Sequence, residues 1–98
     1  MKTATPRPVK RAQRDIAANL DLARRQQRIT VAVLASRTAI SEPTILKLLN
    51  KGEGTLETFL RVAMVLGMLD NAVGATDPLT TPLGRVLAED DIPQRVRC

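Results

Sequence analysis

Residues 29–50 have the sequence ITVAVLASRTAISEPTILKLLN, and this stretch decides the fold. Thr30 and Ser41 each precede a run of helix-forming residues, and a hydroxyl there can accept a hydrogen bond from the first turn of a helix. Pro43 lies in the first turn after Ser41, where a helix does not need the missing N–H. Apolar residues recur at helical spacing in both runs, as Leu34 and Ala35, then as Ile45, Leu48 and Leu49. The stretch therefore predicts two short helices joined by a turn.

The turn between these helices is predicted at Thr38-Ala39-Ile40, which breaks the helical pattern. A left-handed backbone at Ala39 would be strained by its Cβ at a cost of roughly 1 kcal/mol. Ile40 is expected to fill the gap that follows the turn. Helices this short are marginal in isolation, so packing against the rest of the chain has to hold them.

Outward from this stretch, the sequence predicts further helices on both sides. A helix over about 9–27 precedes it, because these residues include no Pro or Gly and carry apolar residues at helical spacing. Thr55 is expected to cap a fourth helix, which Gly67 closes. A short fifth helix is predicted over 68–73. A last one is predicted over 82–88, with Thr81 as its cap.

These elements predict an all-α protein: a five-helix domain with a short C-terminal extension that is partly helical and partly extended. The expected parts are a flexible basic arm over 1–8, the main domain over 9–74 and the extension over 75–98. Composition agrees, because the chain has one Phe and no Trp or Tyr. Strands draw on aromatic and β-branched residues, so an aliphatic chain of this kind favours helices.

Charge is distributed unevenly along the chain. The net charge is +5, and residues 1–28 carry eight Lys and Arg against two Asp, whereas residues 68–98 carry three against five acidic residues. A basic front indicates either a polyanionic partner or a solvated basic tail. The basic residues nearest the start can add contacts to phosphates: Lys2, Arg7, Lys10 and Arg11.

The composition argues against an enzyme. The chain has no His and a single cysteine, Cys98, and its carboxylates form no cluster, so neither a histidine base nor a metal site is expected. No Gly-rich phosphate loop follows a strand, and no cofactor is expected. RNA binding is possible on charge, although the aromatic residues that stack on bases are missing. Without an apolar span or signal core, and with no disulfide possible within the chain, a cytoplasmic protein is expected, with no membrane contact.

The order and spacing of several segments resemble the helix-turn-helix of the XRE family, the relatives of phage repressors and Cro proteins. The resemblance covers roughly residues 12–70. Its marks are Leu20-x-x-Ala23-Arg24, Thr30, Leu34-Ala35, Ile40-Ser41-x-x-Thr44-Ile45-x-x-Leu48, and Thr55-Leu56-Glu57-Thr58 with Val62 to Gly67. The resemblance implies a transcriptional regulator that binds duplex DNA with residues 41–50 as its recognition helix.

The same resemblance implies roles for particular residues. The positions that face bases are held by Glu42, Pro43 and Lys47. The positions expected to contact phosphate are Thr30, Ser41 and Thr44, with Lys51 on the same outer face. The chemistry is consistent, because a lysine can donate to guanine and a glutamate can accept from the cytosine amino group.

Three positions depart from the family pattern. Val31 stands where many members have a glutamine that contacts phosphate. Leu49 stands where many have a glutamate paired with the arginine at the position of Arg24. Ala39 replaces the usual glycine of the turn. These departures concern phosphate clamping more than the fold.

The C-terminal third resembles a subgroup of HipB-like antitoxins, through Leu66-Gly-Met-Leu-Asp70, Asp77-Pro78, Pro82-Leu-Gly84 and Ile92-Pro-Gln-Arg-Val-Arg97. This resemblance implies an autorepressor that acts beside a HipA-type kinase toxin. A homodimer is expected, with contacts to its second copy or to the toxin through Met64, Met68, Leu69 and Val73. Two alternatives remain open: a plain helical bundle, and a protein-interaction module that covers a toxin without binding specific DNA.

Overall fold

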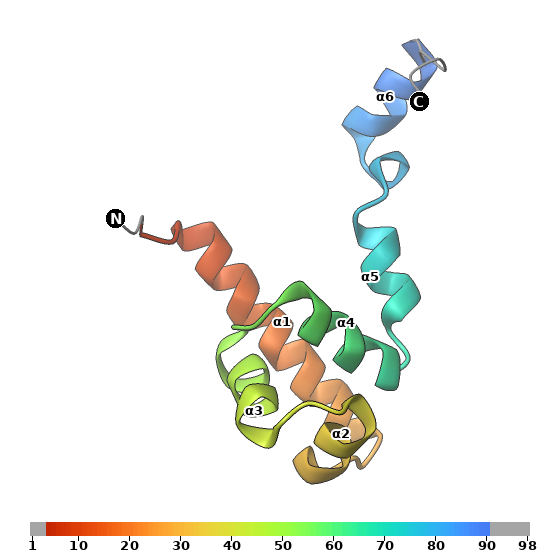
Figure 1. Cartoon of the computed structure of the whole chain (residues 1–98). Helices are drawn as coiled ribbons and strands as arrows, with labels where there is room; N and C mark the ends of the chain where they lie inside the picture. The colour runs from red at the N-terminus through yellow and green to blue at the C-terminus, as the bar shows by residue number, and fades with distance from the viewer. Residues whose placement is uncertain (1–3, 91–98) are drawn as a thin grey trace. The chain divides into compact units, whose positions relative to one another are not determined.

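The computed structural model describes residues 4–90, and within that range the chain is all-α, as predicted. Its helices are α1 (Arg7–Gln26), α2 (Val31–Thr38), α3 (Glu42–Lys51), α4 (Leu56–Val65), α5 (Leu69–Ala75), a short 3-10 helix η1 (Pro78–Thr80) and α6 (Pro82–Asp90) (Figure 1). Contacts divide the chain into two compact units, Met1–Met68 and Leu69–Cys98. The first unit therefore contains α1 to α4, and the second contains the rest.

Two boundaries differ from those expected. Helix α1 begins at Arg7 rather than near Val9, because Pro8 lies in its first turn, where no N–H is needed. The expected arm over 1–8 is therefore partly helical. The first compact unit ends at Met68, whereas the expected main domain runs to residue 74, so that α5 falls in the second unit. Lys2, Cys98 and the segment over 91–98, which is predicted to be extended, lie outside the described residues.

The predicted helix caps at Thr30, Ser41 and Thr55 are confirmed. Each hydroxyl accepts a hydrogen bond from the backbone N–H three residues later, at 3.1 Å for Val33, 3.4 Å for Thr44 and 3.1 Å for Thr58. Such a cap stabilises a helix by about 1 kcal/mol because it satisfies a donor that has no partner within the helix.

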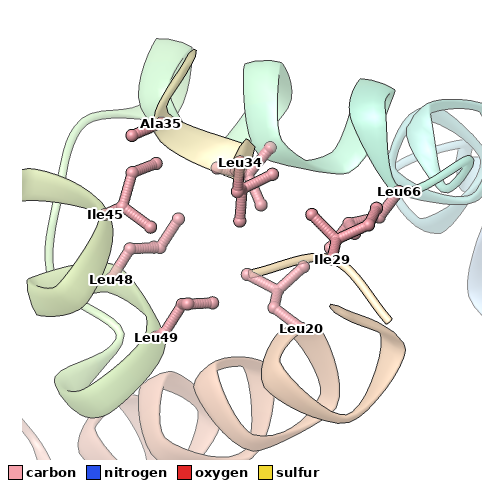
Figure 2. Packing of buried hydrophobic residues seen from close by; sticks show 9 residues of the cluster. Leu20, Ile29, Leu34, Ala35, Ile45, Leu48, Leu49 and Leu66 are labelled. Carbon is pink, nitrogen blue, oxygen red and sulfur yellow. The ribbon is translucent and has the colours of Figure 1, made fainter. Parts of the chain in front are cut away.

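The core of the first unit is aliphatic and joins all four of its helices (Figure 2). Its buried members are Leu20, Ile29, Leu34, Ala35, Ile45, Leu48, Leu49, Val62 and Leu66. Three of these come from α3, which contacts both α1 and α2. This packing fixes the orientation of α3, so the side of α3 that stays in solvent is set by the core.

The predicted turn follows α2, and its backbone is left-handed at Ala39, with φ 60° and ψ 35°. A side chain from α4 supports it, because Arg61 donates a hydrogen bond of 3.0 Å from Nη1 to the carbonyl oxygen of Thr38, the last residue of α2. Arg61 is also paired with Glu57, at 2.7 Å between Nη2 and Oε2. The angle between α2 and α3 is therefore held by α4 as well as by the core.

Replacing Ala39 by Gly is expected to raise the free energy of unfolding by about 0.5–1 kcal/mol. Glycine removes the steric cost of the left-handed conformation, roughly 1–2 kcal/mol. Part of this gain is offset because glycine loses more backbone entropy on folding than alanine does. Ala39 is exposed, so no packing is lost. Urea denaturation measures the change. The matched control is Ala18→Gly, at an exposed position within α1. This change should lower the free energy of unfolding by a similar amount. If both changes stabilise the protein, or if neither does, the left-handed strain at Ala39 is not the cause.

The end of α3 approaches α1 at a glycine. Gly52 has φ 69°, and a Cβ there would collide with the backbone carbonyl of Gln13. The Gln13 side chain in turn donates from Nε2 to the carbonyl oxygen of Gly52 at 3.3 Å. Helix α3 thus ends at Gly52, whose lack of a side chain also lets α1 and α3 pack backbone to backbone.

The second unit consists of α5, η1 and α6. Thr81 caps α6 as predicted, accepting a hydrogen bond of 3.0 Å from the N–H of Gly84, and Pro82 opens the helix. The large apolar side chains of α6, at Leu83, Val86 and Leu87, are more than half exposed. Among residues 4–90, no helix has both the length and the apolar character needed to cross a membrane.

Candidate nucleic-acid interface

Helix α3 has one buried face and one solvent face. Ile45, Leu48 and Leu49 are 0%, 3% and 5% exposed and form the buried face. The opposite face carries every residue of α3 that the sequence singled out as a base or phosphate contact: Glu42, Pro43, Thr44, Lys47 and Lys51. All five are exposed. The inner and outer faces predicted for this helix are therefore confirmed, which leaves a helix whose outer surface is free to contact a partner.

A depression beside Lys47 brings the starts of two helices together. It has a volume of about 240 Å³ and is lined by Pro43, Thr44, Lys47, Glu53, Gly54, Thr55 and Thr58. The threonines belong to the first turns of α3 and α4, and helix N-termini carry partial positive charge and free N–H groups. A lysine next to two helix N-termini forms a surface that attracts an anion, and Glu53 at its edge opposes that attraction in part.

Sequence reasoning assigned Thr55 only a capping role and gave Thr58 no role. The depression groups them with the predicted contacts Thr44 and Lys47. The signal that could have found them is the cap itself, since an exposed capped N-terminus is an anion site wherever the fold directs it toward a partner. Thr30 is also exposed at the start of α2, but it does not line this depression.

Leu46 is a second feature that the sequence reasoning left without a role. Its side chain is 41% exposed although it is large and apolar, and it lies in α3 next to Lys47. A branched apolar side chain on the outer side of such a helix can contact the methyl group of thymine. The solvent-exposed side chains of α3 therefore include a carboxylate at Glu42, an ammonium group at Lys47 and an apolar group at Leu46.

The positions that depart from the family pattern have structural explanations. Val31 packs against the core, so it does not serve the contact that a glutamine would make there. Leu49 is buried and offers no carboxylate to Arg24. Arg24 instead forms an ion pair with Asp21, at 2.8 Å from Nη2 to Oδ1, and donates a hydrogen bond of 2.9 Å from Nη1 to the carbonyl oxygen of Ile29. Arg24 thus ties α1 to the segment that leads into α2.

Several cations of the first unit are left without an acidic partner. The ion pairs found between residues 4 and 90 join Asp21 to Arg24 and Arg25, and Glu57 to Arg61. None of them includes Lys47 or Lys51, both of which are exposed. Lys47 and Lys51 therefore place uncompensated positive charge on the outer face of α3.

The four residues expected to form a dimer or partner contact are divided between the two units. Met64, in α4, is 56% exposed and Val73, in α5, is 63% exposed. Met68 packs against the core of the first unit, and Leu69 is half-buried in the second. Met68 is thus partly used by the fold, whereas Met64 and Val73 keep exposed apolar surface.

Comparisons with protein-family models, with curated proteins and with solved structures found no match to this chain. Within residues 4–90 the chain is all-α, and its first unit holds a short helix, α3, whose solvent-facing side carries two lysines and lies beside two capped helix N-termini.

Proposed function

We propose that this chain is a transcriptional regulator that binds specific duplex DNA by inserting α3 into the major groove, as a helix-turn-helix of the XRE type. The observation that carries the proposal is the outer face of α3, where all five singled-out side chains are exposed and two lysines have no acidic partner among the described residues. The major groove of B-DNA is about 12 Å wide and admits one α-helix.

In this proposal, base recognition rests on the first part of α3, because the N-terminal residues of a recognition helix contact base edges. Lys47 donates to O6 or N7 of guanine, and Glu42 accepts from the amino group of cytosine. Pro43 and Leu46 contribute apolar contacts. Ile45 and Leu48 are buried in the core and so fix the direction in which these side chains of α3 point.

Phosphate contacts in this proposal come from helix N-termini and from Lys51. Thr30 and Ser41 begin α2 and α3 with exposed hydroxyls, and Thr44 lies beside Lys47. We add Thr55, at the start of α4, on the same reasoning. Such contacts fix the position of a protein on the duplex and carry no sequence information themselves.

The proposal is tested by measuring binding to the duplex immediately upstream of the chain's own reading frame. An autorepressor should prefer that duplex to a shuffled duplex of equal length and composition by a hundredfold or more, which corresponds to about 2.7 kcal/mol. Both titrations use the same salt concentration, since the electrostatic share of the affinity depends on it. Equal affinity for the two duplexes would refute autorepression, and failure to bind either would refute DNA binding.

We further propose that the protein acts as a homodimer in the cytoplasm. A single α3 reaches only a few base pairs, and two-fold symmetry doubles the site that is read. The exposed Met64 and Val73 provide apolar surface for the second copy. Sedimentation at tens of micromolar checks this: a dimer is expected, and a single species of monomer mass would contradict it.

The finer proposal is that the chain is the antitoxin of a HipA-type kinase toxin, which the resemblance of its C-terminal third suggests. The observation in favour is the exposed apolar side of α6, at Leu83, Val86 and Leu87, with Leu79 in η1 also exposed. The test is co-expression with a HipA-type kinase encoded next to this chain. Kinase activity should fall in the complex, and it should return when the three α6 residues are replaced by Ser; unchanged kinase activity would overturn the proposal.

The same apolar surface favours the second candidate function, a protein-interaction module without specific DNA binding. The salt dependence of binding distinguishes the two candidate functions. Binding to DNA weakens steeply with salt because counterions are released, whereas an apolar protein contact responds far less.

A further inference from the structure

A second groove of the first unit lies between α1 and the end of α3. It has a volume of about 620 Å³, and its lining is mostly polar: Thr5, Lys10, Gln13, Arg14, Asn50, Lys51 and Glu53. Three of these seven residues are cationic and one is acidic. The groove is thus a positively charged hollow, not an apolar pocket for a small ligand.

The cations of this groove are held close by the fold. Lys10 and Arg14 lie four residues apart on α1 and therefore share one side of that helix. Lys51 is the last residue of α3, and the contact between Gln13 and Gly52 fixes this end of α3 against α1. The like charges repel one another, and the free chain gains no ion pair that would offset this, since none within residues 4–90 includes these three side chains. A bound anion would relieve the repulsion.

The groove is adjacent to the proposed base-reading surface. Glu53 lines both hollows, the one around Lys47 and the one around Lys51, so the two are neighbours along the α3–α4 connection. When a helix lies in the major groove, the DNA backbone passes on either side of it. A groove at the end of α3 then faces a backbone and not the bases.

We propose that Lys10, Arg14 and Lys51 together bind a phosphate of the duplex backbone, beyond the base pairs that α3 contacts. This inference rests on the proposed DNA binding and extends it, because it assigns the first half of α1 to the interface. Gln13 and Asn50 can add neutral donors to the same phosphate, and Glu53 limits the site to a small number of negative charges. The contact lengthens the footprint and contributes no base preference.

The experiment measures the affinity of the full chain for its preferred duplex, chosen from random sequences, at a series of salt concentrations. The slope of log affinity against log salt falls by about 0.9 for each phosphate contact that is lost. Because the three cations share one phosphate, the double variant Lys10→Gln/Arg14→Gln should flatten the slope by about 0.9, and Arg14→Gln alone by part of that amount. Arg25→Gln is the matched control, since Arg25 is an exposed arginine near the other end of α1 that does not line the groove, and it should leave the slope unchanged.

A second readout identifies the anion as duplex phosphate. The duplex is shortened one base pair at a time from each end, and the wild-type chain should lose affinity at a length that the double variant still tolerates without loss. Circular dichroism establishes that each variant keeps its helices. If the wild type binds DNA but Arg14→Gln leaves the slope unchanged, as Arg25→Gln does, and the wild type and the double variant lose affinity at the same duplex length, this inference is overturned and the proposed function stands. If the wild type binds no duplex, both fail.

Discussion

Replacing Ile45 by Ala is expected to lower the free energy of unfolding by about 2–5 kcal/mol, the largest stability change expected here. Ile45 is fully buried and faces Leu34 and Leu48 in the core (Figure 2). Its truncation removes apolar contacts and leaves a cavity between α2 and α3. A domain of this size is stable by about 5–15 kcal/mol in total, so the variant should be partly unfolded at modest urea concentrations. Urea denaturation followed by circular dichroism measures the loss.

The control is Leu46→Ala in the same helix. Leu46 is large and apolar as well, but it is 41% exposed on the outer face. Its truncation should cost less than about 1 kcal/mol, since little buried surface is removed. Equal destabilisation by the two changes would mean that α3 is not oriented by the core in the way described.

Replacing Lys47 by Ala is expected to weaken binding to the preferred duplex by about 1–3 kcal/mol, a loss of roughly 5- to 140-fold in affinity. Affinity for random duplex should fall much less, because the lost contact is to a base. Stability should hardly change, since Lys47 is exposed and forms none of the ion pairs found within residues 4–90. Fluorescence anisotropy with both duplexes at one salt concentration gives the comparison.

Lys51→Ala serves as the partner variant, because Lys51 is an exposed lysine one turn further along the same helix. As a phosphate contact it should weaken the preferred and the random duplex by the same factor. Should Lys47→Ala also weaken both equally, Lys47 would be a phosphate contact, and base recognition would have to be assigned elsewhere on α3.

Much of the first unit could be predicted from interactions between residues that are close in the sequence. The caps at Thr30, Ser41 and Thr55 follow from hydrogen bonding within four residues, so a single sequence carries the signal. The inner face of α3 follows from helical periodicity. The break in the helical pattern at Thr38-Ala39-Ile40 predicts the turn that ends α2, where Ala39 has a φ of 60°.

Contacts between distant residues could not be predicted in this way. The hydrogen bonds from Arg61 to Thr38, from Gln27 to Leu66 and from Gln13 to Gly52 join residues 23 to 39 positions apart. Polar side chains of this kind follow no periodic pattern, and many geometries are open to them before the fold is known. The replacement of the expected Arg24 pair by Asp21 and a backbone carbonyl has the same origin, because it depends on where the α1–α2 connection passes.

Only part of the candidate site could be predicted, because the rest depends on contacts between distant residues. Residues within α3 were found because they share one helix and its outer face. The approach of Thr55 and Thr58 to Lys47, and of Lys10 and Arg14 to Lys51, arises from packing between helices. The sequence predicts the start of α1 too late, because Pro6 and Pro8 are typical of a flexible arm, although proline is compatible with a first helical turn.

The most direct test of DNA binding by α3 is nuclear magnetic resonance of the nitrogen-15-labelled chain, titrated with its preferred duplex. The account predicts that the largest shifts in amide signals occur at the starts of α2, α3 and α4 and along the outer face of α3, at Thr30, Thr44 and Lys47. Buried Ile45 and Leu48 should shift less. Shifts confined to α5 and α6, with α3 unaffected, would contradict the account.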